Sequence, residues 1–108
     1  MKVPEPYAIV LVNLEPTIGS EIRKTRPCVV VSPREMNEHL RTVVVVPVTS
    51  AGKGYPTRVP IAHPKVTGSM AIDQIRTIDT RRIIRVLGKL APREITRCKA
   101  VLREAFVD

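Results

Sequence analysis

The sequence predicts a mainly β protein, a small antiparallel barrel or strongly bent sheet that is followed by one C-terminal helix. Several short runs rich in Val, Ile and Thr are separated by Pro, Gly and Ser, whereas only the last segment has a helical period. Hydrophobic residues make up 44% of the 108 residues but aromatic residues only 3%, which favours a compact core of β-branched side chains. We expect a single domain over residues 1–108. These patterns do not choose among SH3-like, OB-like and related barrels.

The first two strands are bounded by prolines. Residues 7–14, YAIVLVNL, are predicted to form a strand that ends before Pro16. Residues 28–32, CVVVS, are predicted as a second strand, which is entered through Pro27 and ended by Pro33. A long first loop therefore separates the two strands.

The third strand is expected at the centre of the sheet. Residues 42–49, TVVVVPVT, are too apolar for either face to lie in water. Pro47 has no N–H to donate, so it fits only near a bulge or an edge. We expect the backbone to kink there and to re-aim Thr49.

The remaining segments complete the barrel and end in a helix. Residues 34–40 are predicted as a short helical turn, and residues 57–62, 66–72 and 82–87 as further strands. From residue 91 the spacing of apolar side chains predicts a helix that caps the barrel. The predicted apolar face of this helix comprises Ile95, Cys98, Val101, Leu102, Ala105 and Phe106.

The chain is strongly basic, with 18 Lys and Arg against 10 Asp and Glu and a formal net charge of +8 at pH 7. A polyanion is the natural partner of such a surface, although many small basic domains are simply soluble. Nucleic acid fits better than a membrane, because residues 8–12 and 43–48, the longest apolar runs, are far shorter than the roughly 20 residues of a membrane helix. Aromatic side chains are too scarce for a generic single-strand binder, since only Tyr55 is available to stack on bases.

Cysteine usage and the N-terminal residues both indicate an ordinary cytoplasmic protein. The N-terminus lacks the long apolar centre of a signal peptide, so we expect a cytoplasmic location. Cys28 and Cys98 lie far apart, without CxxC spacing or a His neighbour of metal-site type. Both are predicted to be buried thiols.

Three motifs suggest a family. The stretches IVLVNLEPTIGSEIRKTRPCVVVSP, VVVVPVTSAGKGYP and DQIRTID occur in this order over residues 9–33, 43–56 and 73–79. Together they closely resemble the MazF/PemK family of toxin endoribonucleases. The resemblance implies an SH3-like barrel of the CcdB/MazF/PemK type, a two-fold homodimer, and cleavage of single-stranded RNA without a metal ion or other cofactor. It also implies a MazE-like antitoxin whose acidic C-terminal segment lies in the RNA groove.

The resemblance places Arg26 and Thr49 in the active site. Metal-free RNA cleavage uses the ribose 2′-hydroxyl as nucleophile, so the enzyme must remove a proton, stabilise the phosphorane and protonate the leaving 5′-oxygen. The planar guanidinium of Arg26 suits two phosphate oxygens at once, and by position it matches the family's catalytic arginine. Thr49, at the end of an apolar strand, is implied to donate its hydroxyl to the phosphate; on the residues alone, a solvated cation and a strand-terminal Thr remain open.

The general base is left open between Glu21 and Asp73. Glu21 lies in the first loop, where the family has an acidic residue, and Asp73 matches an aspartate that PemK-type relatives use in proton transfer. Those relatives carry a His and an Arg where this chain has Ser20 and Ala71. Asp73 is therefore also interpreted as a buried carboxylate that binds backbone N–H groups.

Further residues are expected to bind RNA or to be exposed. His39 and His63 match no catalytic position of the family and are predicted to be surface residues. Family members often have a Gly-Asp or Gly-Glu pair before the first strand, where this chain has Pro6, Tyr7 and Ala8. The residues expected to contact RNA are Ser20, Arg23, Lys24, Lys53, Tyr55, Gln74, Arg76 and Thr77.

Two other classes of function remain open. A toxin on the same barrel can poison a topoisomerase by binding alone, as CcdB does, and then needs no catalytic arginine. A non-catalytic SH3-like interaction module would account for the basic surface, and salt-dependent RNA binding without cleavage would favour it.

Overall fold

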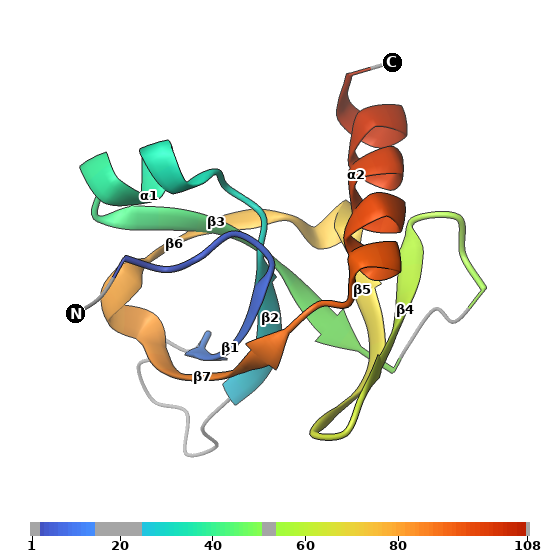
Figure 1. Cartoon of the computed structure of the whole chain (residues 1–108), viewed down its shortest axis with the longest axis horizontal. Helices are drawn as coiled ribbons and strands as arrows, with labels where there is room; N and C mark the ends of the chain where they lie inside the picture. Colours follow the sequence, from blue (N-terminus) through green and yellow to red (C-terminus); the bar gives the residue numbers. More distant parts are fainter. Residues whose placement is uncertain (1–2, 15–24, 51–53, 108) are drawn as a thin grey trace, which may run out of the picture.

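The computed structural model describes residues 3–14, 25–50 and 54–107. Short strands dominate these ranges, and the one long helix comes last, as the sequence predicts (Figure 1). Neither α-helix in the described ranges is long and apolar enough to cross a membrane. The elements are β1 (Ala8–Asn13), β2 (Thr25–Val30), α1 (Arg34–His39), β3 (Thr42–Thr49), β4 (Arg58–His63), β5 (Val66–Ala71), η1 (Ile72–Gln74), β6 (Arg76–Asp79), η2 (Thr80–Arg82), β7 (Ile83–Lys89) and α2 (Pro92–Phe106).

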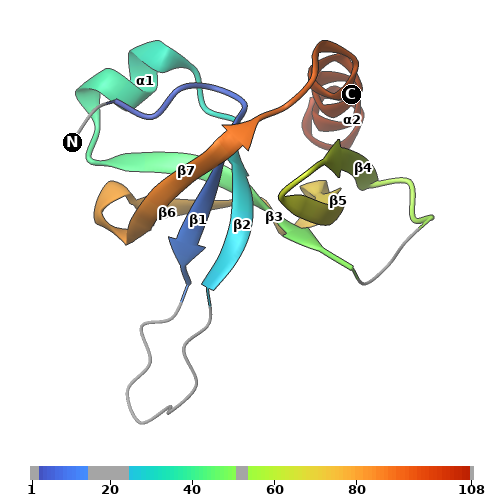
Figure 2. The same cartoon turned by 60° about the horizontal axis from the view of Figure 1, so that its bottom comes forward.

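The strands form one antiparallel sheet that curls into an SH3-like barrel. Their order is β4-β5-β3-β2-β1-β7, and β6 pairs with β3 beside β5. The turn η2 joins β6 to β7, so the two ends of the barrel sheet come back towards each other (Figures 1 and 2). The hairpin of β4 and β5 stands apart from the barrel, and α2 packs beside it.

Strand β3 lies at the centre of the sheet, as predicted. Its first half, from Thr42 to Val45, pairs with β6, and its last two residues, Val48 and Thr49, pair with β5. Pro47 falls between these two partners, where β3 needs no N–H for either ladder. The proline therefore marks the point at which the sheet divides into barrel and hairpin.

Alternation along the strands builds two cores. One face of β1 to β3 packs inside the barrel, and we call this the barrel core; the other face packs against β4, β5 and α2, and we call this the sheet–helix core. Because β3 supplies Val43 and Val45 to the first and Val46 and Val48 to the second, both of its faces are packed. The barrel core comprises Ala8, Val10, Val12, Cys28, Val30, Val43, Val45 and Ile78.

The predicted boundaries need two corrections in the strands. Strand β2 begins at Thr25, so Pro27 lies inside the strand, opposite Leu11, and not at its entrance. Strand β6 was not predicted, because RTID is short, polar at its first two positions and exposed there. Its pairing with the apolar strand β3 is what makes this segment a strand.

Helix α2 covers the sheet–helix core with only part of its predicted face. Cys98 and Val101 are buried, but Phe106 is 55% exposed because the helix extends beyond the sheet (Figure 1). At its other end, both carboxylate oxygens of the buried Glu94 accept backbone hydrogen bonds, from Ala91 N at 2.9 Å and from Ala62 N at 2.7 Å. Glu94 thus caps α2 and fixes it to β4.

The chain enters β1 through a left-handed residue. Tyr7 has a φ of 66°, a conformation that favours glycine. Its backbone is held from both sides, because Tyr7 N donates to Val30 O at 2.6 Å and its carbonyl accepts from Leu90 N at 3.1 Å. Its ring packs on the sheet–helix core, and the Lys99 ammonium lies 5.7 Å from the ring centre.

Candidate active site

A cavity lies at one end of the barrel core, and its lining comes from the ends of β1 and β3 and the beginnings of β2 and β6. Along each of these strands, the residues that point into the barrel core are followed by one that lines the cavity. In β2, for example, Val30 and Cys28 are in the core and Arg26 is in the cavity. The cavity has a volume of about 460 Å³ and is lined by Leu14, Arg26, Pro47, Thr49, Gln74 and Arg76.

Arg26 and Thr49 both line the cavity, just beyond the last pair of the β2–β3 ladder. That pair is Cys28 and Pro47, and each of the two site residues lies two positions further along its strand. Arg26 also pairs with Val12 of β1, within the barrel wall, and Thr49 pairs with Ser69 of β5. The half-buried Arg26 is thus held by strand pairing, which is how a rigid site positions a reactive side chain.

Basic and polar side chains make up most of the cavity lining. Arg76, the first residue of β6, adds a second guanidinium, and Gln74 of η1 adds an amide. Among the described residues, no carboxylate lines this cavity. Two guanidinium groups and a hydroxyl together match the oxygens of a phosphodiester.

Cys28 lies in the barrel core, two residues after Arg26 in β2. Its thiol is fully buried and donates to the carbonyl oxygen of Arg26 over 3.7 Å. Burial raises the pKa of Cys28 to about 12, although the nearby charges of Arg26 and Arg76 act in the opposite direction. The thiol is therefore neutral and serves packing, as the sequence predicts for both cysteines; Cys98 is likewise buried.

Asp73 lies beside this cavity but is bound to other side chains. Its carboxylate accepts from Arg58 Nε at 3.0 Å and Nη2 at 3.2 Å, and from the Thr57 hydroxyl at 2.8 Å. The hydrogen bonds from Arg58 and then Thr57 lower the pKa of Asp73. The carboxylate is 41% exposed, so the interpretation of Asp73 as a buried group bound mainly to backbone N–H groups is wrong.

The other predicted site residues fall into three groups. Tyr55 is 59% exposed and its ring lies over Arg58, outside the cavity. Thr77 pairs with Val44 and has the opposite strand parity to Arg76, so it does not line the cavity. The described ranges do not include Ser20, Glu21, Arg23, Lys24 and Lys53.

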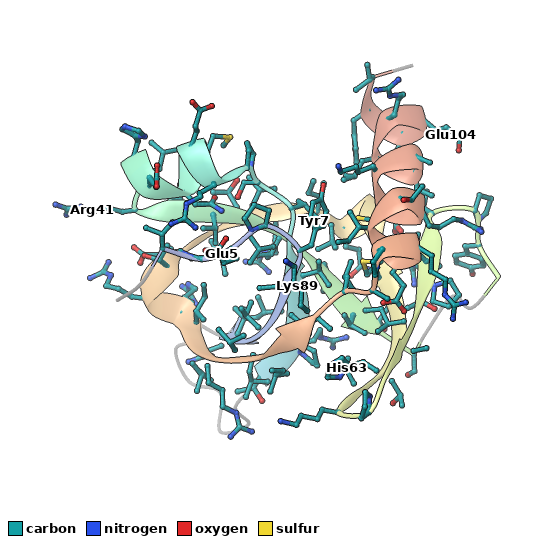
Figure 3. All side chains as sticks on the ribbon, in the orientation of Figure 1. Glu5, Tyr7, Arg41, His63, Lys89 and Glu104 are labelled. Atoms are coloured by element: carbon teal, nitrogen blue, oxygen red, sulfur yellow. The ribbon has the colours of Figure 1, made fainter. Side chains whose placement is uncertain are left out.

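Neither histidine lies in the cavity lining. His39 is exposed at the end of α1, with Nδ1 2.8 Å from the Glu35 carbonyl oxygen. His63 is half-buried between β4 and β7, where its ring occupies the space beside Gly88 (Figure 3). In the described part of the chain, no group of three or more His, Cys, Asp or Glu side chains is arranged to hold a metal ion.

Arg58 is a charged residue near the site that sequence reasoning missed. Its side chain is only 7% exposed, although arginine at the start of a short strand normally faces solvent. The signal that could have found it is its position three residues after Tyr55 and opposite Ala71, which lies two residues before Asp73. Only the sheet register brings these segments together.

The chain is similar to a family of toxins. Residues 5–106 match the PemK-like, MazF-like toxin of type II toxin–antitoxin systems. The endoribonuclease toxin MazF of Escherichia coli K12 is 35% identical over 99 residues, 91% of this chain and 89% of that protein. The endoribonuclease PemK of Escherichia coli is 41% identical over 76 residues, 66% of this chain and 57% of that protein.

A solved structure agrees with the sequence relatives. A chain of the MazE–MazF crystal structure (Form-II) from Deinococcus radiodurans has a TM-score of 0.85 and 30% identity, and the match covers 97% of this chain and 96% of that chain. The fold and the basic cavity together define the class of protein, a small β-barrel of the kind that these toxins share. The chain belongs to the PemK-like, MazF-like toxin family, and the resemblance in its three motifs is confirmed.

Proposed function

We propose that this chain is the toxin of a type II toxin–antitoxin system and acts as a sequence-specific endoribonuclease on single-stranded RNA, without a metal ion or other cofactor, and so inhibits translation. The observation that supports this most is that Arg26 of β2 and Thr49 of β3 line one cavity, together with a second guanidinium, that of Arg76. Family membership and the endoribonuclease names of the relatives agree with it.

In the proposed reaction, a ribose 2′-oxygen attacks the adjacent phosphorus and the bond from phosphorus to the 5′-oxygen breaks. The products are a 2′,3′-cyclic phosphate and a 5′-hydroxyl. Arg26 stabilises the negative charge of the phosphorane and protonates the leaving oxygen, and Thr49 donates a second hydrogen bond to the phosphate. Arg76 holds the phosphate of a neighbouring nucleotide, because it lines the same cavity from another strand.

The proton of the 2′-hydroxyl passes to Glu21 or to Asp73. Three hydrogen bonds from Arg58 and Thr57 lower the pKa of Asp73, which weakens it as a base. Glu21 is therefore the favoured acceptor in this proposal, and Asp73 the alternative. Glu21→Gln and Asp73→Asn separate them. The cleavage rate rises with pH as the base ionises, and this rise is lost only in the variant that lacks the base.

The proposed partners follow from the same basic cavity. We place the RNA strand across Gln74, Arg76 and Tyr55, and the antitoxin, a MazE-like protein, binds there through an acidic C-terminal segment. A solved relative is a MazE–MazF complex. We also propose a homodimer and a cytoplasmic location. Contacts from Ser20, Arg23, Lys24, Lys53 and Thr77 belong to this proposal.

The test is cleavage of a long single-stranded RNA by the purified protein in EDTA, with end mapping and with Arg26→Ala in parallel. The proposal predicts discrete cuts with 2′,3′-cyclic phosphate ends, lost in the variant. A folded protein that cuts nothing would overturn it. Trapping of a topoisomerase would then indicate a toxin that acts by binding, and salt-dependent RNA binding alone would indicate an interaction module.

A further inference from the structure

We propose that Arg58 is a positioning residue that holds the η1 wall of the cavity and the ring of Tyr55 in fixed relation, and so sets how the RNA strand aligns with Arg26. Arg58 itself does not reach RNA, because its side chain is only 7% exposed. It acts through two neighbours, Asp73 and Tyr55. This inference rests on the proposed function and deepens it.

The first link joins Arg58 to the cavity wall. Its guanidinium forms a two-pronged contact with Asp73, Nε to Oδ1 at 3.0 Å and Nη2 to Oδ2 at 3.2 Å. The adjacent Thr57 adds its hydroxyl to Oδ1 at 2.8 Å, and its carbonyl accepts from Ile72 N at 3.0 Å. Because Asp73 precedes Gln74 in the single turn of η1, these contacts fix the segment that carries Gln74 into the cavity.

The second link joins Arg58 to an exposed aromatic ring. The guanidinium carbon lies 5.3 Å from the centre of the Tyr55 ring, and Arg58 N donates to the Tyr55 carbonyl at 3.0 Å. The ring is 59% exposed although one side of it rests on the guanidinium. An exposed ring held in place is the surface on which proteins stack single-stranded bases. One buried cation therefore connects a base-stacking surface to a phosphate-binding cavity.

The energetics favour a positioning role over a purely stabilising one. Burying a guanidinium removes it from water, so a buried ion pair as a whole adds little net stability; removing one partner is costly only where the other charge stays buried. What an apolar side chain cannot supply is the two-pronged geometry or the attraction to the ring face. Since Asp73 is 41% exposed, water can solvate its carboxylate after Arg58→Met, so this variant is expected to fold.

The test is single-turnover cleavage of a short RNA that spans one mapped cut site. Arg58→Met should raise the enzyme concentration for half-maximal rate on the order of tenfold, the scale of one lost base-stacking contact, with the saturating rate within about threefold. Cut-site choice on a long RNA should broaden, and Arg58→Lys should give an intermediate result. Arg34→Met is the control: it removes the same charge from an exposed residue of α1 paired with Glu5 and Glu38.

A double-mutant cycle gives a readout that a structural role would not move. Because Arg58 is proposed to act partly through Tyr55, Tyr55→Ala should have less effect in Arg58→Met than in the wild type. Unchanged half-maximal concentration and cut sites in Arg58→Met, beside an active wild type, would overturn this inference alone. A wild type that cuts no RNA would overturn the proposed function, and this inference with it.

Discussion

Strand alternation in β2 places Arg26 in the cavity. It is the first inward-facing residue of β2 at the open end of the barrel core, directly beyond Cys28. The same alternation in β3 places Thr49, two residues beyond Pro47, in the same cavity. Two strands thus fix the guanidinium and the hydroxyl at the same end of the barrel, so each substitution there should alter chemistry without altering the fold.

Arg26→Ala should lower the single-turnover rate by about 10²–10³, the usual effect of removing one donor to a charged transition state. Arg26→Lys should recover only part of the rate, because a single ammonium cannot contact two phosphate oxygens at once. Thermal unfolding and RNA binding should change little. Cleavage by Arg26→Ala at the wild-type rate would rule out its proposed role.

Tyr7 combines a packed ring with a left-handed backbone. Tyr7→Gly and Tyr7→Ala lose the same ring contacts, but only glycine adopts a φ of 66° without strain. We therefore expect Tyr7→Gly to be about 1 kcal/mol more stable than Tyr7→Ala in urea unfolding. Equal stability would mean that the backbone relaxes when the ring is removed.

At the level of elements, the division of β3 between two partners determines the cavity. After Pro47, β3 leaves β6 for β5, and its last residue, Thr49, pairs with Ser69 of β5. Gly68, next to Ser69, has a φ of +131°, and a Cβ at this position would lie 2.8 Å from the Thr49 carbonyl oxygen. The hairpin therefore presses its backbone directly against a site residue.

Gly68→Ala should consequently reduce both stability and cleavage. Gly54→Ala is the matched control, because its φ of +93° brings similar backbone strain, of about 1–3 kcal/mol, but a Cβ there meets no atom within 4 Å. Both variants should unfold at lower urea concentration, whereas only Gly68→Ala should lose saturating cleavage rate. If the two variants cleave equally well, contact with Thr49 does not position the site.

The apolar patterns within single segments predicted much of this fold. The contacts between segments could not be predicted from these patterns. The double-faced apolar run of β3 and the helical period of α2 were both sufficient to place these elements. Strand β6 was missed because its partner β3 makes it a strand. Arg58 was missed for the same reason: its burial depends on Asp73, 15 residues later in the chain.

At the scale of the whole molecule, the two buried thiols are expected to make the free energy of unfolding fall as the pH rises above 9. Burial raises the pKa of Cys28 to about 12 and that of Cys98 to about 11, from 9.0. Their contribution is complete below the unfolded pKa and is lost as the pH rises towards the folded values, because only the unfolded thiols ionise in between. Each thiol should lower the unfolding free energy by about 1.4 kcal/mol per pH unit above pH 9.

This pH dependence is measured by urea unfolding between pH 7 and pH 10.5, with Cys28→Ala/Cys98→Ala as the reference. Above pH 9, the free energy of unfolding should fall more steeply with pH for the wild type than for the reference. Parallel pH profiles would show that the thiols ionise in the folded protein.

The central claim is that a phosphodiester binds at the mouth of the barrel and is cleaved by its own 2′-hydroxyl beside Arg26. The most direct measurement compares a short RNA spanning one mapped cut site with the same RNA carrying a single 2′-deoxy nucleotide on the 5′ side of that bond. The account predicts that both bind equally and that only the unmodified RNA is cut. Cleavage of the 2′-deoxy substrate would contradict it, because the attacking oxygen would then have to come from elsewhere.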